Sequence, residues 1–171
     1  MELCHDTMTK SEPEIILQKA TLVDVDEYIA LEKKVGGRTY AALTSKEQFL
    51  NELEKWTVYL FKKDGKVIGH ISYQIESDGG IRFGGLAIEP ELQGKGFGRA
   101  ALELIVEKIK DAPKVEFVVH PDNLRAIELY KSFGAKIVGR KENCYGDGEP
   151  RIIMIKNLTK MIGAKTQSTK K

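Results

Sequence analysis

Residues 86–102 constrain the fold more than any other stretch, because an apolar segment runs through a glycine cluster directly into a helical pattern. Gly94, Gly96 and Gly98 form the cluster. Glycine lets the backbone turn and approach a ligand without a Cβ clash, so several N–H groups can face one space. The next helix adds unpaired N–H groups and the positive end of its dipole. The stretch therefore predicts a strand, an anion-binding loop and a helix in succession.

This loop carries charge but departs from two familiar phosphate loops. Lys95 and Arg99 would place positive charge beside a pyrophosphate or a 3′-phosphate. A Walker loop ends in Gly-Lys-Ser or Gly-Lys-Thr, whereas this loop ends Gly98-Arg99-Ala100. The dinucleotide fingerprint requires a third glycine where Arg99 stands. Glycine-rich turns also precede helices that bind nothing, so the loop alone leaves its ligand open.

Two motifs in order give a more specific signal. Residues 93–98 (QGKGFG) match Gln-x-x-Gly-x-Gly, and residues 123–135 (NLRAIELYKSFGA) match Asn-x-x-Ala-x-x-x-Tyr-x-x-x-Gly. Together they resemble the acetyl-CoA loop and the following helix of the GCN5-related N-acetyltransferase (GNAT) superfamily. The resemblance covers roughly residues 14–158. Within the superfamily, the chain most resembles the ribosomal-protein and amino-terminal acetyltransferases.

The resemblance implies acetyl-CoA as cosubstrate and a set of binding residues. Backbone groups of Leu86, Ala87 and Ile88 would pair with the pantetheine arm as if it were another strand. Asn123 and Tyr130 would also contact the cosubstrate. The pyrophosphate loop would comprise Gln93, Gly94, Lys95, Gly96, Phe97, Gly98 and Arg99.

Composition excludes several classes of protein. A length of 171 residues suits one domain, and a net charge of +2 gives no reason to expect nucleic acid or a membrane surface. We find no apolar run long enough to span a bilayer and no secretory signal, so we expect a cytoplasmic protein. Cys4 and Cys144 form no close pair, and the three histidines lack zinc-ligand spacing, so we expect no metal. A monomer and a homodimer are both compatible with the sequence.

The periodicity of the chain predicts an α/β (α+β) domain at residues 14–158, between a flexible leader (1–13) and a flexible basic tail (159–171). We predict Asp24 as the N-cap of the first helix and a capping box at the start of the second, with Thr44 or Ser45 as cap and Glu47 three residues after Thr44. Asp64-Gly65 indicates a hairpin. The predicted strands span residues 15–20, 57–61, 66–73, 81–88, 115–119, 136–141 and 151–156, and the predicted helices lie at 21–35, 44–55, 99–110 and 123–134.

This order suits a single-domain GNAT-like fold: a mixed, mostly antiparallel sheet flanked by helices. The helix between residues 88 and 115 permits a parallel relationship of the strands on either side of it. In the resembling family the sheet splays between these two strands, and the pantetheine arm lies in the splay.

Acetyl transfer to an amine requires a neutral amine and a proton for the leaving thiolate. At pH 7 a lysine amine costs about 4.6 kcal/mol to deprotonate, whereas an α-amine costs about 1 kcal/mol. Tyr130 occupies the family's tyrosine position and is our candidate general acid. At helical spacing from Ala126 and Phe133 it could equally be a core residue. Asn123 could bind the cosubstrate, cap its helix, or do both.

The general base is not evident from the sequence. Some relatives of this family carry a glutamate where Arg82 stands, and the ribosomal-protein acetyltransferases carry one where Val118 stands. Glu89, Glu76 and Glu32 are weaker candidates, each expected on the solvated surface, and a chain of waters is the alternative.

The acceptor also stays open. Residues 143–151 resemble the hairpin that walls the acceptor site in amino-terminal and ribosomal-protein acetyltransferases, which would bring Tyr145 to the acceptor. Residues 36–40 lack the Leu-Pro-Glu-Asn-Tyr element of the amino-terminal enzymes. We expect direct attack by a primary amine of a protein or peptide. The alternatives are a small-molecule amine such as a polyamine, an amino acid or an antibiotic, a non-catalytic acyl-CoA-binding module, or a nucleotide-phosphate binder.

Overall fold

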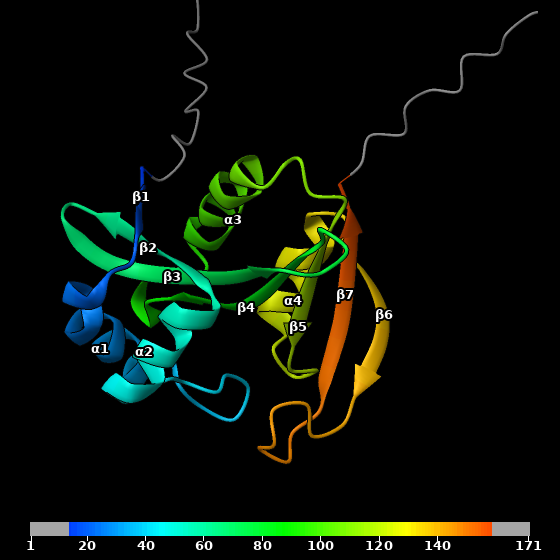
Figure 1. The fold of residues 1–171 in the computed structure, drawn as a ribbon, viewed down its shortest axis with the longest axis horizontal. Helices are drawn as coiled ribbons and strands as arrows, with labels where there is room; N and C mark the ends of the chain where they lie inside the picture. Colours follow the sequence, from blue (N-terminus) through cyan, green and yellow to red (C-terminus); the bar gives the residue numbers. More distant parts are fainter. Residues whose placement is uncertain (1–13, 159–171) are drawn as a thin grey trace, which may run out of the picture.

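The structure, a computed structural model, describes residues 14–158 and contains one seven-stranded sheet in the order β1-β2-β3-β4-β5-β7-β6 (Figure 1). The predicted leader and tail lie outside these residues. Neighbouring strands are antiparallel except β4 and β5, which confirms the mixed, mostly antiparallel sheet. The strands are β1 (Ile16–Lys19), β2 (Thr57–Lys63), β3 (Lys66–Ile75), β4 (Ile81–Ile88), β5 (Lys114–Val119), β6 (Lys136–Lys141) and β7 (Arg151–Asn157).

Four α-helices and two short 3-10 turns join these strands. The helices are α1 (Val25–Val35), α2 (Lys46–Lys55), α3 (Phe97–Lys108) and α4 (Leu124–Ser132), and the turns are η1 (Leu22–Asp24) and η2 (Pro90–Leu92). The predicted order of strands and helices is therefore confirmed, with boundaries that differ by a few residues. Within residues 14–158, no helix combines the length and the apolar character needed to cross a membrane.

Local sequence accounts for the turns and helix starts, with two corrections. Asp64 and Gly65 both have positive φ, as the tight turn of a β-hairpin requires. The capping box uses Ser45, one of the two predicted cap residues, with Gln48 instead of Glu47: the Ser45 hydroxyl accepts from the Gln48 N–H, and the Gln48 side chain accepts from the Ser45 N–H. Asp24 is the N-cap residue of α1 as predicted, but its carboxylate makes no capping bond to α1 and accepts from Thr21 instead, because the chain first forms the turn η1.

Successive residues of a strand point to opposite faces of the sheet, and β2 shows how this divides the core. Val58 and Leu60 pack in a cluster with Tyr28 of α1 and Phe49 of α2. Phe61 points to the other face and belongs to the cluster that holds α3 and α4. Figure 1 shows α3 on the opposite side of the sheet from α1 and α2. Both faces are thus covered, which leaves the edges and strand ends for function.

The central feature of the sheet is a splay between β4 and β5. The two strands pair in parallel only where Ile81–Phe83 faces Val115–Phe117. Beyond that point β4 continues to Ile88 while pairing with β3 alone. A register shift in the β3–β4 pairing places Gly84 as an extra residue where the strands part. The predicted splay is confirmed, and both candidate pockets lie beside it.

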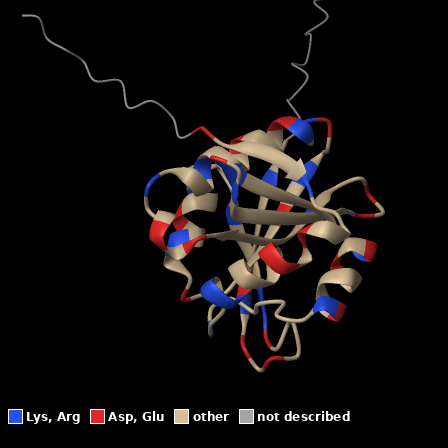
Figure 2. Cartoon of the chain, turned by 90° about the vertical axis from the view of Figure 1, so that its left-hand side faces the viewer, with Lys and Arg blue, Asp and Glu red and all other residues tan. Residues whose placement is uncertain are grey.

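Charged side chains on one face are mixed in sign. Figure 2 shows Lys and Arg interspersed with Asp and Glu along the helices that face the viewer. Interspersed charges of both signs give little long-range field. The charges that matter for a ligand are therefore those inside the pockets.

The close packing of β2, β3 and β4 generates a stability prediction. A Cβ on Gly69 would lie 2.5 Å from the Ala87 carbonyl oxygen and 2.9 Å from the Phe61 ring. We expect Gly69→Ala to lower the free energy of unfolding by about 1–3 kcal/mol, because the backbone of β4 must shift to accept the methyl group. Urea denaturation measures the change.

Gly139→Ala is the matched control, because a Cβ there meets nothing within 4 Å. It should change stability by less than about 0.5 kcal/mol. Equal stability of the two variants would contradict the close packing at Gly69.

Candidate active site

Two pockets flank the splay. We call the first the loop pocket, because the end of β4, the glycine loop and the start of α3 and α4 line it. Every residue predicted to bind acetyl-CoA lines it except Lys95 and Phe97. Phe97 is 6% exposed and belongs to the core cluster, so its side chain faces away from a ligand. These contacts with a ligand stay a prediction.

The glycine loop has the geometry of an anion site. Gly94 and Gly96 have φ of 75° and 90°, which favour glycine, and Gly96 is the N-cap of α3. The unpaired N–H groups of the first helical turn therefore begin at the pocket. The Gln93 side chain donates to the Ile88 carbonyl and accepts from Arg125, which ties the loop to β4 and α4.

Two arginines, Arg99 and Arg125, form a basic rim on the loop pocket, and only Arg99 was predicted from the sequence. Arg99 was predicted and lines the pocket; its guanidinium donates to the Ser132 hydroxyl. Arg125 was not predicted, although it stands inside the motif of residues 123–135. Its contact with Gln93 shows that α4 carries it to the glycine loop. Backbone N–H groups and two guanidinium groups suit the phosphates of acetyl-CoA.

The second cavity, the inner pocket, has a volume of about 400 Å³ and lies under the loops that follow α1 and β6. It shares Tyr40, Leu86, Asn123 and Tyr130 with the loop pocket, so the two cavities meet in the splay. Val118 and Tyr145 also line it, as do Glu32, Glu52, Trp56 and His70. One ligand can therefore lie in each pocket with their reactive ends adjacent.

Tyr130 stands at the junction of the two pockets. It is 7% exposed and its ring stacks on Phe117, with centroids 4.1 Å apart. Burial first, and then the neighbouring Tyr145, raise the pKa of Tyr130, so the hydroxyl stays protonated and can donate but not accept a proton. The sequence left open whether Tyr130 is a core residue or a site residue. The two roles are compatible, because Tyr130 belongs to the core and lines both pockets. Asn123 caps α4 by accepting from the Ala126 N–H.

The structure corrects the expectation for Glu32, which was assigned to the solvated surface. Glu32 and His70 are each 1% exposed, and Glu32 Oε1 lies 2.5 Å from His70 Nε2. Glu32 also accepts from the Tyr40 hydroxyl and from the Leu43 N–H. Burial raises the pKa of Glu32, but these hydrogen bonds, that from His70 foremost, outweigh burial and hold the pKa below its usual value.

The other acidic candidates have ordinary surface partners. Glu89 pairs with Lys34, and Glu76 accepts from Gln74. Arg82, at one expected glutamate position, donates to Glu116 Oε1 over 2.9 Å. The hydrophobic Val118, at the other position, lines the inner pocket. Among the five positions considered from sequence, only Glu32 brings a carboxylate to a pocket.

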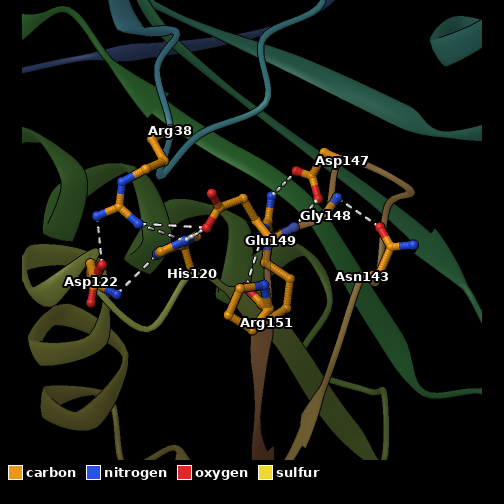
Figure 3. Close-up of polar contacts among 9 residues, drawn as sticks. Arg38, His120, Asp122, Asn143, Asp147, Gly148, Glu149 and Arg151 are labelled. Atoms are coloured by element: carbon orange, nitrogen blue, oxygen red, sulfur yellow. Dashed lines mark hydrogen bonds and ion pairs between the residues drawn. The ribbon is translucent and has the colours of Figure 1, made fainter.

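A set of charged contacts joins three segments beside the inner pocket, which one of its residues, His120, lines (Figure 3). Arg38, in the loop after α1, pairs with Asp122 at 2.6 Å and with Glu149 at 3.5 Å. His120, at the end of β5, lies 2.7 Å from Glu149 through Nε2. His120 Nδ1 accepts from the Asp122 N–H, so Nε2 carries the proton and donates to Glu149. We call these four residues the clasp.

The loop between β6 and β7 is shaped by its own contacts. Asn143 Oδ1 accepts from the Gly148 N–H, and buried Arg151 pairs with Asp147. The Arg151 guanidinium lies 4.9 Å from the centre of the Tyr145 ring, which lines the inner pocket. An acceptor contact by Tyr145 stays a prediction. No cluster of His, Cys, Asp and Glu side chains that could hold a metal lies within residues 14–158.

Comparison with known proteins gives the family. A model of the acetyltransferase (GNAT) family matches residues 26–135. A putative ribosomal protein bS18-alanine N-acetyltransferase from Bacillus subtilis is 33% identical over 141 residues, which cover 78% of this chain and 89% of the relative. The chain belongs to the GNAT family. It is an N-acetyltransferase, and the family uses acetyl-CoA as cosubstrate.

Two further similarities agree with this assignment. An N-alpha-acetyltransferase from Sulfurisphaera tokodaii is 27% identical over 161 residues, covering 85% of this chain and 94% of the relative. The crystal structure of Ard1 from Thermoplasma volcanium superimposes with a TM-score of 0.75 at 19% identity, covering 85% of this chain and 99% of that one. The similarity to Ard1 concerns the fold alone.

The glycine loop yields the first prediction about binding. Gly96→Glu should abolish acetyl-CoA binding, because it adds a negative side chain to the anion site and Gly96 has a φ that side chains rarely adopt. Isothermal titration calorimetry with acetyl-CoA measures the loss.

Gly65→Glu is the matched control, because Gly65 also has a positive φ but lies in the β2–β3 hairpin, outside both pockets. The control should bind acetyl-CoA like wild type. Retained binding in Gly96→Glu would mean that the loop pocket is not the cosubstrate site.

Proposed function

We propose that this enzyme holds acetyl-CoA in the loop pocket and an amine acceptor in the inner pocket, and that it acetylates the N-terminal α-amine of a protein or peptide. The observation that carries the proposal is the junction of the two pockets at Leu86, Asn123 and Tyr130. With both ligands bound, the amine nitrogen can attack the thioester carbonyl directly. No covalent enzyme intermediate is then needed.

Acetyl-CoA would supply the activated acetyl group, and this chain would supply its contacts. Leu86, Ala87 and Ile88 present β4 backbone along an edge that β5 has left, as a pantetheine arm requires. The glycine loop, Arg99 and Arg125 would hold the phosphates. Asn123 would position the cosubstrate while it caps α4.

Two considerations favour an α-amine as acceptor. The relatives from Bacillus subtilis and Sulfurisphaera tokodaii carry names that specify acetylation of a ribosomal-protein alanine and of N-alpha positions. An α-amine also loses its proton near neutral pH at a cost about 3.6 kcal/mol lower than that of a lysine side chain. A site with a single buried carboxylate–imidazole pair can meet the smaller demand.

One observation supports a small cationic amine as the second candidate. Two carboxylates, Glu32 and Glu52, line the inner pocket. A compact polycation such as spermidine would bring two opposite charges to those carboxylates.

An acceptor panel separates the two candidates. We expect the enzyme to acetylate a peptide with a free N-terminal alanine and to release CoA thiol, measured by a thiol reagent and by mass spectrometry of the peptide. The matched control is the same peptide with a formylated N-terminus, so that an internal lysine carries its only primary amine. This control should not react.

If spermidine is acetylated with a higher kcat/KM than the peptide with the free N-terminus, the acceptor is a small-molecule amine and not a protein N-terminus. Acetyl-CoA binding without turnover on any amine would support a non-catalytic acyl-CoA-binding module and overturn the proposed function.

Tyr130 is the proposed general acid, since its protonated hydroxyl lies where both pockets meet. We expect Tyr130→Phe to lower kcat by about 10²-fold or more, because the thiolate must leave without its proton donor. The acetyl-CoA dissociation constant should stay within about twofold, because the ring still stacks on Phe117. Steady-state kinetics and calorimetry test both statements, and an unchanged kcat would remove Tyr130 from this role.

A further inference from the structure

The inner pocket contains a hydrogen-bonded cluster whose path for the acceptor proton the proposed function leaves unassigned. Glu32 and His70 lie at its wall, and Tyr40 connects them to the splay. We propose that Tyr40 and Glu32 form a proton relay: the Tyr40 hydroxyl takes a proton from the acceptor ammonium as it passes its own proton to the Glu32 carboxylate, which His70 positions. The inference deepens the proposed function and rests on it.

Tyr40 has the position that the entrance of such a relay requires. It lines both pockets, and its hydroxyl donates to Glu32 Oε1 over 2.9 Å. A Cβ on Gly85 would lie 3.2 Å from that hydroxyl, so the absence of a side chain on Gly85 leaves room beside it. Gly85 belongs to the part of β4 that β5 does not pair with, where the acceptor would meet the thioester.

Glu32 has the surroundings that the end of a relay requires. It is ionised, because it accepts hydrogen bonds from His70, Leu43 and Tyr40. Its burial opposes these hydrogen bonds and so reduces the cost of a proton that arrives there. A water-filled path from Glu32 to solvent is unnecessary, because the proton can return through Tyr40 after the product leaves.

His70 fixes the carboxylate that receives the proton. Since Glu32 is ionised, His70 Nε2 carries the proton of their shared hydrogen bond. Among the buried side-chain atoms of residues 14–158, His70 Nδ1 has no hydrogen-bond partner. The ring is held by Tyr28, with centroids 4.5 Å apart.

Two further titratable groups face this cluster, Tyr28 from α1 and Glu52 from α2. Burial, followed by the charge of Glu32, raises the pKa of both Tyr28 and Tyr40, so both stay protonated. Burial also raises the pKa of Glu52. Glu32 is therefore the stronger acid of the two carboxylates and the one that a tyrosine hydroxyl contacts.

The bond changes balance. The ammonium gives one proton through Tyr40 to Glu32, and the neutral amine attacks the thioester carbonyl. The C–N bond forms as the C–S bond breaks, and the second amine proton compensates the one that Tyr130 gives to the thiolate. The products are the amide and CoA thiol, and Glu32 later releases its proton to solvent.

The pH dependence of acetylation tests the relay. We expect Tyr40→Phe and Glu32→Gln each to lower kcat/KM for the alanine peptide by about 10²-fold at pH 7. The loss should shrink to less than about tenfold at pH 9.5, because an α-amine with a pKa near 7.8 is then already neutral. The double variant should lose no more than Glu32→Gln alone, since both act on one proton path.

Matched controls and binding measurements exclude a structural effect. Tyr59→Phe and Glu76→Gln alter residues that line neither pocket and should keep wild-type kinetics. Calorimetry should give Tyr40→Phe an acetyl-CoA affinity within about twofold of wild type. If Glu32→Gln does not fold, Tyr40→Phe alone decides, because it removes one oxygen atom and keeps the ring.

His70→Gln tests the positioning role separately. Loss of its hydrogen bond should raise the pKa of Glu32 and move the acidic limb of the kcat profile to higher pH. A loss in Tyr40→Phe that is the same at every pH, or full activity, would overturn the relay. A wild-type enzyme that acetylates no amine would instead overturn the proposed function, and the relay with it.

Discussion

The short pairing between β4 and β5 is the constraint on which the rest of the structure depends. After Phe83 and Phe117 the two strands part, so the facing edges of β4 and β5 lose each other as hydrogen-bond partners. Backbone N–H and C=O groups need partners, and an extended ligand amide can supply them. Strand β4 keeps its path because β3 pairs with it on the other edge as far as Ile88. The gap between β4 and β5 is therefore bordered by a strand that β3 holds in place.

An aromatic stack connects this gap to the core. Phe83 lies 4.9 Å from Phe117, and Phe117 lies 4.1 Å from Tyr130, measured between ring centroids. The stack begins at the last paired residues of the two strands and ends at the residue between the two pockets. Packing that holds the sheet together therefore also fixes the orientation of the Tyr130 ring.

Buried charge is concentrated on the other side of the inner pocket. A carboxylate as enclosed as Glu32 is stable only when its oxygens are hydrogen-bonded, and three donors from two segments provide those bonds. The donors come from the loop after α1 and from β3, which are separated by α2 and β2 in the sequence. The same bonds that stabilise the charge also bring Tyr40 to the splay.

Local patterns predicted much of the fold. Strand alternation, the Asp64-Gly65 turn and the motif that opens α4 each depend on residues close in sequence, and the structure confirms the elements they predict. Both Thr44 and Ser45 were predicted as possible caps of α2, and only the entering backbone selects Ser45, which makes Gln48 and not Glu47 its partner. The glycine loop was located by its own residues.

Local sequence patterns could not predict the inner pocket. Glu32 stands on a helix among lysines, and the sequence gives no sign that its side chain turns inward to a histidine on β3. Arg125 and Tyr40 likewise reach their pockets only because α4 and the loop after α1 pack beside the splay. The sequence by itself determined the elements, the family motifs and the glycine loop, because each rests on local backbone chemistry. Only the tertiary structure decided which carboxylate is buried at the inner pocket, because burial depends on contacts between distant segments.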